Sequence, residues 1–240
     1  MDTLRFLIGG VLPYVAVLVF LVAMVWRVRS WMKLPAPAMT LFPAPEPDGK
    51  ATAINTAKEA VFFRSLFKGD KPLWAFAWGF HVVLALIFIG HARVVSNVDR
   101  VFMSLGMTEA GIQGMSSGVG GAAGILILLT AVILLARRLL LPRVREITSI
   151  GDVLALSLIG AIVITGNMMR FAPEHFDLGL TREYFANLAT FSGVGDAAAL
   201  QNGVFLTHMC LALLLLMYIP FSKILHFGGI FFTHQLIRKQ

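Results

Sequence analysis

The chain has 240 residues, of which 58% are hydrophobic and 14% charged, and its mean hydropathy is +0.80. Soluble domains carry about 25% charged residues, so the composition argues against a soluble enzyme and for membrane spans of about 20 apolar residues. The single cysteine, Cys210, excludes an internal disulfide and any four-cysteine iron–sulfur or zinc site within the chain. The net charge of +7 does not indicate nucleic acid, because the basic residues flank apolar segments as in cytoplasmic loops of membrane proteins.

Five apolar segments are long enough to cross a bilayer. They cover about residues 6–26, 72–92, 118–136, 153–169 and 203–222. They predict an all-α integral membrane bundle of five helices, forming one domain over residues 1–240. The first segment is too long for a removable signal peptide and has no small-residue cleavage site, so we expect it to be a retained helix.

Residues 27–71, between the first two spans, are expected to form a cytoplasmic loop. The stretch "LFPAPEPDG" (41–49) is proline-rich, which is typical of a loop. The stretch "TAKEAVFFRSLFKGDKPLW" (56–74) predicts an amphipathic helix on the membrane surface. Its apolar side chains are expected to dip into the lipid: Phe62, Phe63, Leu66 and Phe67.

The glycine-rich stretch "GVGGAAG" (118–124) is expected to open the third span. Its small residues allow two helices to pack closely. It is not a phosphate loop, because no Lys-Ser or Lys-Thr follows it and no strand precedes it.

The basic residues predict an orientation. Fifteen of the twenty Lys and Arg residues lie in residues 27–71, 137–152 and 223–240, and five lie on the opposite side. The positive-inside rule therefore places the N-terminus in the periplasm and the C-terminus in the cytoplasm of a bacterial inner membrane. The odd number of spans agrees with termini on opposite sides, and it makes the second and fifth helices antiparallel.

Four histidines lie within or beside these two helices. His81 and His91 are ten residues apart in the second span, and His208 and His226 are eighteen apart in or at the end of the fifth. Ionisable residues inside membrane spans are rare and usually functional. Because the helices are antiparallel, His91 and His208 should share the outer side, and His81 and His226 the inner side. A neutral imidazole is a good iron ligand, so each pair predicts one haem b.

The distance between the two histidines along the helix differs between the second and the fifth span. Ten helical residues rise about 15 Å and eighteen about 27 Å. Helix tilt and a distortion at Pro220 are expected to absorb part of the difference. The alternative interpretation is that each of the four is an ordinary buried histidine bonded to a neighbouring carbonyl. His175 and His234 lie in a loop and a tail and are expected to be ordinary solvated or interfacial residues.

Arginines near both sides are candidates for binding haem propionates, or they serve only to orient the protein in the membrane. They are Arg93 and Arg170 on the outer side, and Arg137, Arg138, Arg143 and Arg145 on the inner side. The inner run "RRLLLPRVR" (137–145) is also compact enough to dock a soluble partner.

Over almost its full length the chain resembles the gamma subunit, a membrane cytochrome b, of respiratory nitrate reductase. The resemblance rests on "PYVAVLVF", "FHVVLALIFIGH", "GGAAGILILLTAVILLARRLLLPRVREITSIGDVLALSL" and "HMCLALLLLMYIPFSKILH". It implies two haems b with the histidine pairing given above. It also implies a quinone site beside the outer haem and an iron–sulfur subunit facing the inner one.

The chain departs from that family near the expected quinone site. Nitrate reductase subunits usually carry a lysine before the glycine-rich stretch, whereas "EAGIQGMSSG" here has none. The polar groups that remain are Glu109 and Gln113. Together with Gly90, His91 and Arg93 they are the candidate quinone-site residues.

The segment "EAVFFRSLFKGDKPLW" resembles cytochrome b subunits that serve heterodisulfide-reductase-like partners, above all the membrane cytochrome of the Dsr sulfur-metabolism complex. This implies a DsrK-like iron–sulfur subunit in the cytoplasm, with further membrane and periplasmic subunits.

The expected function is electron transfer between a membrane quinone, menaquinone or ubiquinone, and that subunit in dissimilatory sulfur metabolism. Three alternatives stay open at this point. The first is a nitrate reductase gamma subunit, which would pass quinol electrons to a nitrate-reducing partner. The second is a haem-free membrane anchor. The third is a transporter, which would need a polar path at mid-membrane, whereas the polar residues here lie mostly near the two surfaces.

Overall fold

The computed structural model describes residues 2–33, 49–194, 197–226 and 228, and in these ranges it is helical with no strand. Five helices are long and apolar enough to cross a membrane: Thr3–Met32, Lys71–Val95, Glu109–Leu140, Ile150–Phe171 and Gly203–Phe221. They confirm the predicted all-α membrane bundle. The predicted side of the membrane for each terminus stays a prediction.

The first span is α1 (Asp2–Phe6), a π-helical turn η1 (Leu7–Val11) and α2 (Leu12–Met32). The next three spans are α5, α7 and α9, and the last is α11 (Gly203–Tyr218) with the 3-10 turn η4 (Ile219–Phe221). Shorter elements connect them: α3 (Gly49–Phe62), α4 (Arg64–Gly69), α6 (Asp99–Ser104), α8 (Pro142–Arg145), η2 (Pro173–His175), α10 (Leu178–Ala189), η3 (Ala198–Gln201) and η5 (Lys223–Leu225).

Polar caps set where the last four spans begin. The side chain of Asp70 accepts a hydrogen bond from the Leu73 N–H at the start of α5, and Thr108 does the same for α7. Ser149 and Asp152 form a reciprocal capping box at the start of α9. Asn202 caps α11. These side chains satisfy N–H groups that a helix start leaves unpaired, which matters most where lipid offers no partner.

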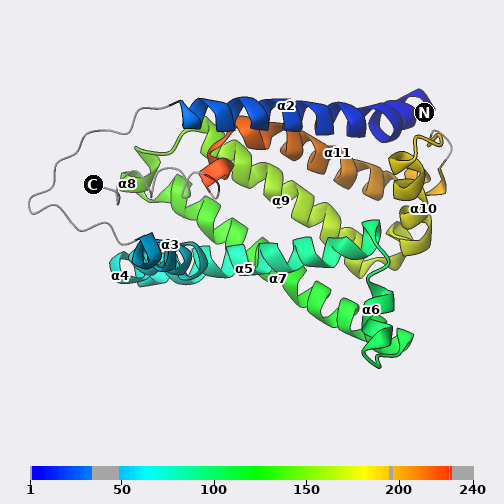
Figure 1. Ribbon diagram of the computed structural model, residues 1–240, viewed down its shortest axis with the longest axis horizontal. Helices are drawn as coiled ribbons and strands as arrows, with labels where there is room; N and C mark the ends of the chain where they lie inside the picture. The colour runs from blue at the N-terminus through cyan, green and yellow to red at the C-terminus, as the bar shows by residue number, and fades with distance from the viewer. Residues whose placement is uncertain (1, 34–48, 195–196, 227, 229–240) are drawn as a thin grey trace, which may run out of the picture.

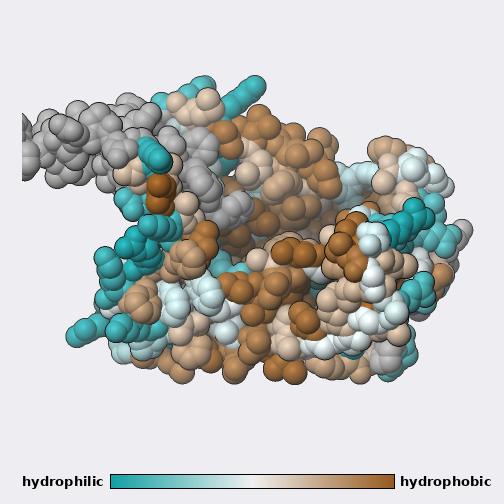
Figure 2. Space-filling view, turned by 60° about the horizontal axis from the view of Figure 1, so that its bottom comes forward, coloured by the Kyte–Doolittle hydropathy of each residue, from teal (hydrophilic) through white to brown (hydrophobic). Residues whose placement is uncertain are grey.

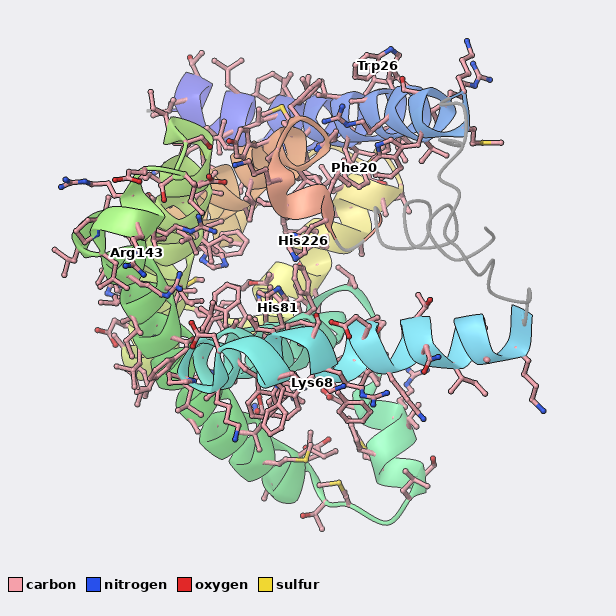
Figure 3. All side chains as sticks on the ribbon, turned by 90° about the vertical axis from the view of Figure 1, so that its left-hand side faces the viewer. Phe20, Trp26, Lys68, His81, Arg143 and His226 are labelled. Carbon is pink, nitrogen blue, oxygen red and sulfur yellow. The ribbon has the colours of Figure 1, made fainter. Side chains whose placement is uncertain are left out.

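The spans form a row in which α5 packs on α7, α7 on α9, α9 on α11 and α11 on α2 (Figure 1). The row bends, so that α5 and α11 face each other although they are far apart in the sequence. Apolar side chains gather over the middle of the molecule and hydrophilic ones at its two ends, as lipid contact requires (Figure 2). We call the end with Lys68, Arg143 and His226 the basic end (Figure 3). We call the end with α6 and α10 the opposite end.

The glycine-rich stretch 118–124 does not open the third span as predicted. The helix begins at Glu109, because Thr108 caps it, and the stretch lies inside α7. Its small residues do allow close packing, since a Cβ on Gly124 would overlap Asn167 Oδ1 of α9. Asn167 Nδ2 donates to the Gly124 carbonyl at 2.9 Å, which ties α9 to α7.

The prediction of one surface helix over residues 56–74 is wrong. The chain forms α3 and α4, which are separated by Phe63 in the left-handed conformation with φ of 49°. The Glu59 carboxylate accepts from the Ser65 N–H at 3.1 Å and so caps α4 across the break. Residues 41–48, most of the predicted proline-rich loop, lie outside the described residues.

Candidate haem-binding site

At the opposite end, His91 of α5 faces His208 of α11. Their ring centroids are 6.4 Å apart and their planes differ by 7°. At the basic end, His81 of α5 faces His226, which follows η5. Their centroids are 5.7 Å apart and the planes are nearly perpendicular, at 88° (Figure 3). The structure thus brings together the same two pairs that the antiparallel topology predicted.

The unequal spacing of the histidines is absorbed by a break in the last span. Regular helix ends at Tyr218, and Pro220, which has no N–H, is buried in the 3-10 turn η4. Ser222 is extended, and η5 then leads to His226. His226 is therefore not on a continuation of α11, and the helical rise assumed for residues 208–226 does not apply. The prediction of a distortion at Pro220 is confirmed.

In all four histidines the ring Nδ1 is hydrogen-bonded to a backbone carbonyl oxygen. The distances are 2.7 Å from His81 to Ala77 O, 2.7 Å from His91 to Ile87 O, 3.0 Å from His208 to Ile162 O and 2.9 Å from His226 to Lys223 O. A carbonyl oxygen only accepts, so Nδ1 carries the proton and Nε2 keeps its lone pair. Within the described residues no hydrogen bond reaches any of the four Nε2 atoms. A metal-bound histidine is usually oriented in this way.

The spacing of the rings fits an iron between them. Two metal–nitrogen bonds of about 2 Å, plus about 1 Å from each nitrogen to its ring centre, place the centroids of two ligating imidazoles about 6 Å apart. Both pairs, at 6.4 and 5.7 Å, are close to this separation. Ordinary buried histidines also bond carbonyls, but that interpretation does not explain why all four face one another in pairs.

Aromatic side chains enclose the pair at the basic end. The ring of Phe63 lies edge-on to His81 at 5.1 Å and that of Phe80 at 5.4 Å. Phe63 is the residue whose left-handed backbone separates α3 from α4. The break between α3 and α4 therefore places the Phe63 ring against His81. This contact takes the place of the lipid contact predicted for Phe63.

An ion network fixes the turn that carries His226. The Asp152 carboxylate, whose side chain is 6% exposed, receives Lys223 Nζ at 2.8 Å and lies 3.8 Å from Arg138. It also accepts from the Ser149 N–H at 2.9 Å. The carbonyl of Lys223 is the one that accepts from His226 Nδ1. The start of α9 therefore holds the histidine-bearing turn in place.

At the opposite end Arg93 is bound to a buried carboxylate. Asp99 receives Arg93 Nε at 2.7 Å and Arg182 Nη2 at 2.7 Å, and Arg182 Nε also donates to the Arg93 carbonyl. This cluster joins α5, α6 and α10. Arg170 lies within electrostatic range of Arg93 and has no ion-pair partner among the described residues. Of the two predicted outer arginines, Arg170 is the one left available to an anionic group.

The Asp99 cluster predicts a pH dependence of stability. Hydrogen bonding from Arg93, and next from Arg182, holds the pKa of Asp99 below its ordinary value. This stabilisation is fully present above pH of about 4 and is lost as pH falls through the lowered pKa. Asp99→Asn is expected to cost on the order of 2 kcal/mol at pH 7. Its apparent unfolding midpoint in detergent should also fall less than that of the wild type between pH 5 and 3, and equal slopes would contradict the assignment.

The candidate quinone residues do not form one cluster. Gly90 is exposed beside His91, and Arg93 is engaged by Asp99. Glu109 and Gln113 are exposed in the first turns of α7, which project away from α5 together with α6 (Figure 1). Within the described residues no hydrogen bond links either of them to His91 or Arg93.

A cavity of about 680 Å³ lies at the opposite end of the bundle, between α2, the end of α5 and α10. Its wall is mostly apolar, and Tyr14, Leu18, Val95, Arg182 and Phe185 contribute to it. Sequence reasoning missed this cavity because its wall comes from three segments that show no shared motif. The contacts of Thr165 and Asn167 were also not predicted. The sequence does carry a signal there, since "ITGN" (164–167) is a polar interruption of an apolar span.

A five-helix membrane bundle with histidines facing in pairs across two antiparallel helices is a cytochrome b-like architecture. Residues 65–239 match the nitrate reductase gamma subunit family, and the chain belongs to this family. The fold and the family together make it a multi-pass protein of the cytoplasmic membrane.

Two named relatives differ in how much of the chain they cover. The Hdr-like menaquinol oxidoreductase cytochrome b-like subunit of Archaeoglobus fulgidus is 32% identical, over 94% of this chain and 77% of its own length. The respiratory nitrate reductase 1 gamma chain of Escherichia coli is 31% identical, over 63% of this chain and 69% of its own length.

Proposed function

We propose that this chain is the dihaem b membrane subunit of a redox complex that exchanges electrons between a quinone and a soluble iron–sulfur partner. The observation that carries the proposal is the pair of facing histidine couples at the two ends of α5 and α11. In every one of the four rings Nδ1 is bonded to a carbonyl, which leaves Nε2 for iron.

Under this proposal His91 and His208 hold one haem, and His81 and His226 hold the other. Haem iron would supply the one-electron redox chemistry. The chain positions the two groups at different depths, orients each ligand through a carbonyl, and places them between apolar helices. Arg170 supplies positive charge at the opposite end of the bundle, close to α7.

The relatives favour one partner class over the other. The match to the Hdr-like subunit covers nearly the whole chain, including the segment before α5, whereas the nitrate reductase chain matches over about two thirds of it. We therefore favour menaquinone over ubiquinone, and a heterodisulfide-reductase-like partner over a nitrate-reducing one. A DsrM-type subunit with a DsrK-like partner, in dissimilatory sulfur metabolism, is the specific assignment that we propose.

The basic end suits the docking of that partner. Arg143 and Lys68 lie at the same end of the bundle as the His81–His226 pair (Figure 3), and both are exposed. With the basic end in the cytoplasm, a soluble subunit would meet the nearer haem there, and the quinone would react at the opposite end. Of the proposed quinone-site residues, Gly90, His91 and Arg93 lie together at the end of α5, whereas Glu109 and Gln113 lie on the projecting start of α7.

A reduced-minus-oxidised absorption spectrum of the purified chain, with a pyridine haemochrome count, tests the proposal. Two haems b per chain are expected. A folded chain that binds no haem would overturn the proposal and favour a membrane anchor or a transporter. One haem per chain would show that one of the two histidine pairs is wrongly assigned.

A further inference from the structure

His208 differs from the other three histidines in where its support comes from. His81, His91 and His226 donate from Nδ1 to a carbonyl three or four residues earlier in their own segment. His208 instead contacts α9, through Ile162 O at 3.0 Å and Thr165 Oγ1 at 2.9 Å. Its orientation therefore depends on a neighbouring helix.

The direction of the Thr165 bond follows from the carbonyls around it. The Thr165 hydroxyl lies 3.0 Å from Ala161 O and 2.9 Å from Ile162 O, and both can only accept. The hydroxyl proton is used there, so a lone pair of Oγ1 faces His208. The Nδ1–H of His208 is consequently shared between the hydroxyl and the Ile162 carbonyl, and Nε2 is left unprotonated.

The next residue makes room for the ring. A Cβ on Gly166 would lie 3.2 Å from His208 Cε1, which is tighter than most Cβ contacts, and 3.7 Å from Nδ1, which is an ordinary contact. A side chain at this position would therefore shift the imidazole by a few tenths of an ångström. Asn167, the residue after it, ties α9 to Gly124 of α7. Residues 165–167 of α9 thus both contact His208 and join α9 to α7.

We propose that Thr165 and Gly166 are positioning residues for the haem ligand His208, an inference that rests on the proposed sharing of one iron by His91 and His208. Thr165 supplies a second acceptor for the Nδ1 proton beside the Ile162 carbonyl, and Gly166 makes room for the ring. A proton donated from Nδ1 raises the basicity of Nε2 and favours ferric over ferrous iron. Thr165 therefore lowers the reduction potential of this haem and leaves the other unaffected.

Redox titration of the purified dihaem chain tests the role of Thr165. Thr165→Val removes the acceptor at nearly constant volume, so the haem count should stay at two while one of the two midpoint potentials rises. The remaining bond to Ile162 limits the effect to at most about tenfold in the reduction equilibrium, which is about 59 mV for a one-electron couple. Thr165→Ser keeps the hydroxyl and should restore the wild-type value.

Matched variants separate positioning from general damage to the bundle. Thr130 on α7 also bonds two carbonyls of its own helix and has no hydrogen bond to any described histidine, so Thr130→Val should leave both potentials unchanged. Gly166→Ala should displace the His208 ring and change the ferric electron paramagnetic resonance signal of one haem. Gly160 on the same helix has no atom near its Cβ position, so Gly160→Ala should change neither signal.

The outcomes distinguish this inference from the proposed function. A wild-type chain without two haems contradicts the proposed function itself. Two haems whose potentials are the same in the wild type and in Thr165→Val overturn the role of Thr165. If Thr165→Val is not recovered folded, Gly166→Ala decides, because an unchanged resonance signal in that variant rejects the positioning of His208 by α9.

Discussion

Alanine at His91 or at His208 is expected to remove the same haem, and alanine at His81 or at His226 the other. The expectation follows from the facing rings, because among the described residues no further histidine ring faces either pair and could replace a lost axial imidazole. Each single variant should therefore keep one haem of two. The haemochrome count and the two midpoint potentials measure which one is lost.

Double variants make the pairing testable. His91→Ala with His208→Ala should lose no more haem than either alone, since both act on one site, whereas His91→Ala with His226→Ala should lose both haems. His175→Ala is the matched control, because its ring lies near Glu174 in η2 and faces no histidine in the part of the chain that the structure describes. If the single variants at His91 and His226 removed the same haem, the pairing would be wrong.

The spans and the histidine pairs were predictable because they depend on composition and topology alone. Twenty apolar residues must be helical in lipid, whatever their neighbours are. Two antiparallel helices that each carry two histidines can match them by depth in only one way. Neither inference needs the positions of particular atoms, so both were available from the sequence.

The contacts that orient the histidines were not predictable. Whether α11 continues to His226 depends on how Pro220 and Ser222 pack, and helical rise alone gave a spacing that the structure does not have. The break at Phe63 depends on a cap formed by Glu59 and on contact with His81. The bond from His208 to Thr165 joins two helices, and no local pattern marks such a bond.

The glycine-rich and polar residues within the spans make contacts between helices that the sequence of each segment alone does not predict. The stretch 118–124 has the composition of a helix start, yet Thr108 provides the cap and the glycines serve the α7–α9 contact instead. Asn167 lies inside the fourth span and donates to Gly124 O, which is how a polar side chain is accommodated between membrane helices.

Lys223→Met is expected to weaken the haem at the basic end selectively. Lys223 reaches Asp152 through its side chain and His226 through its carbonyl, so it joins the start of α9 to the ligand. Its side chain is 72% exposed, so the ion pair itself contributes little to stability, about 1 kcal/mol or less. The larger effect is on the ligand's orientation, where changes to outer-shell partners cost about 10–100-fold in metal affinity.

Haem retention during purification and dilution measures this effect, with the haem of the His91–His208 pair as the internal reference. Lys68→Met is the matched control, since Lys68 is exposed at the same end and has no ion-pair partner among the described residues. Asp152→Ala should act in the same direction and more strongly, because it also removes half of the capping box that starts α9. Equal loss of both haems would show that Lys223 stabilises the bundle as a whole. Selective loss would show that α9 holds the turn after Tyr218 in place through Asp152 and so positions His226. At the opposite end α9 contacts His208 through Thr165, so this one helix would position a ligand of each pair.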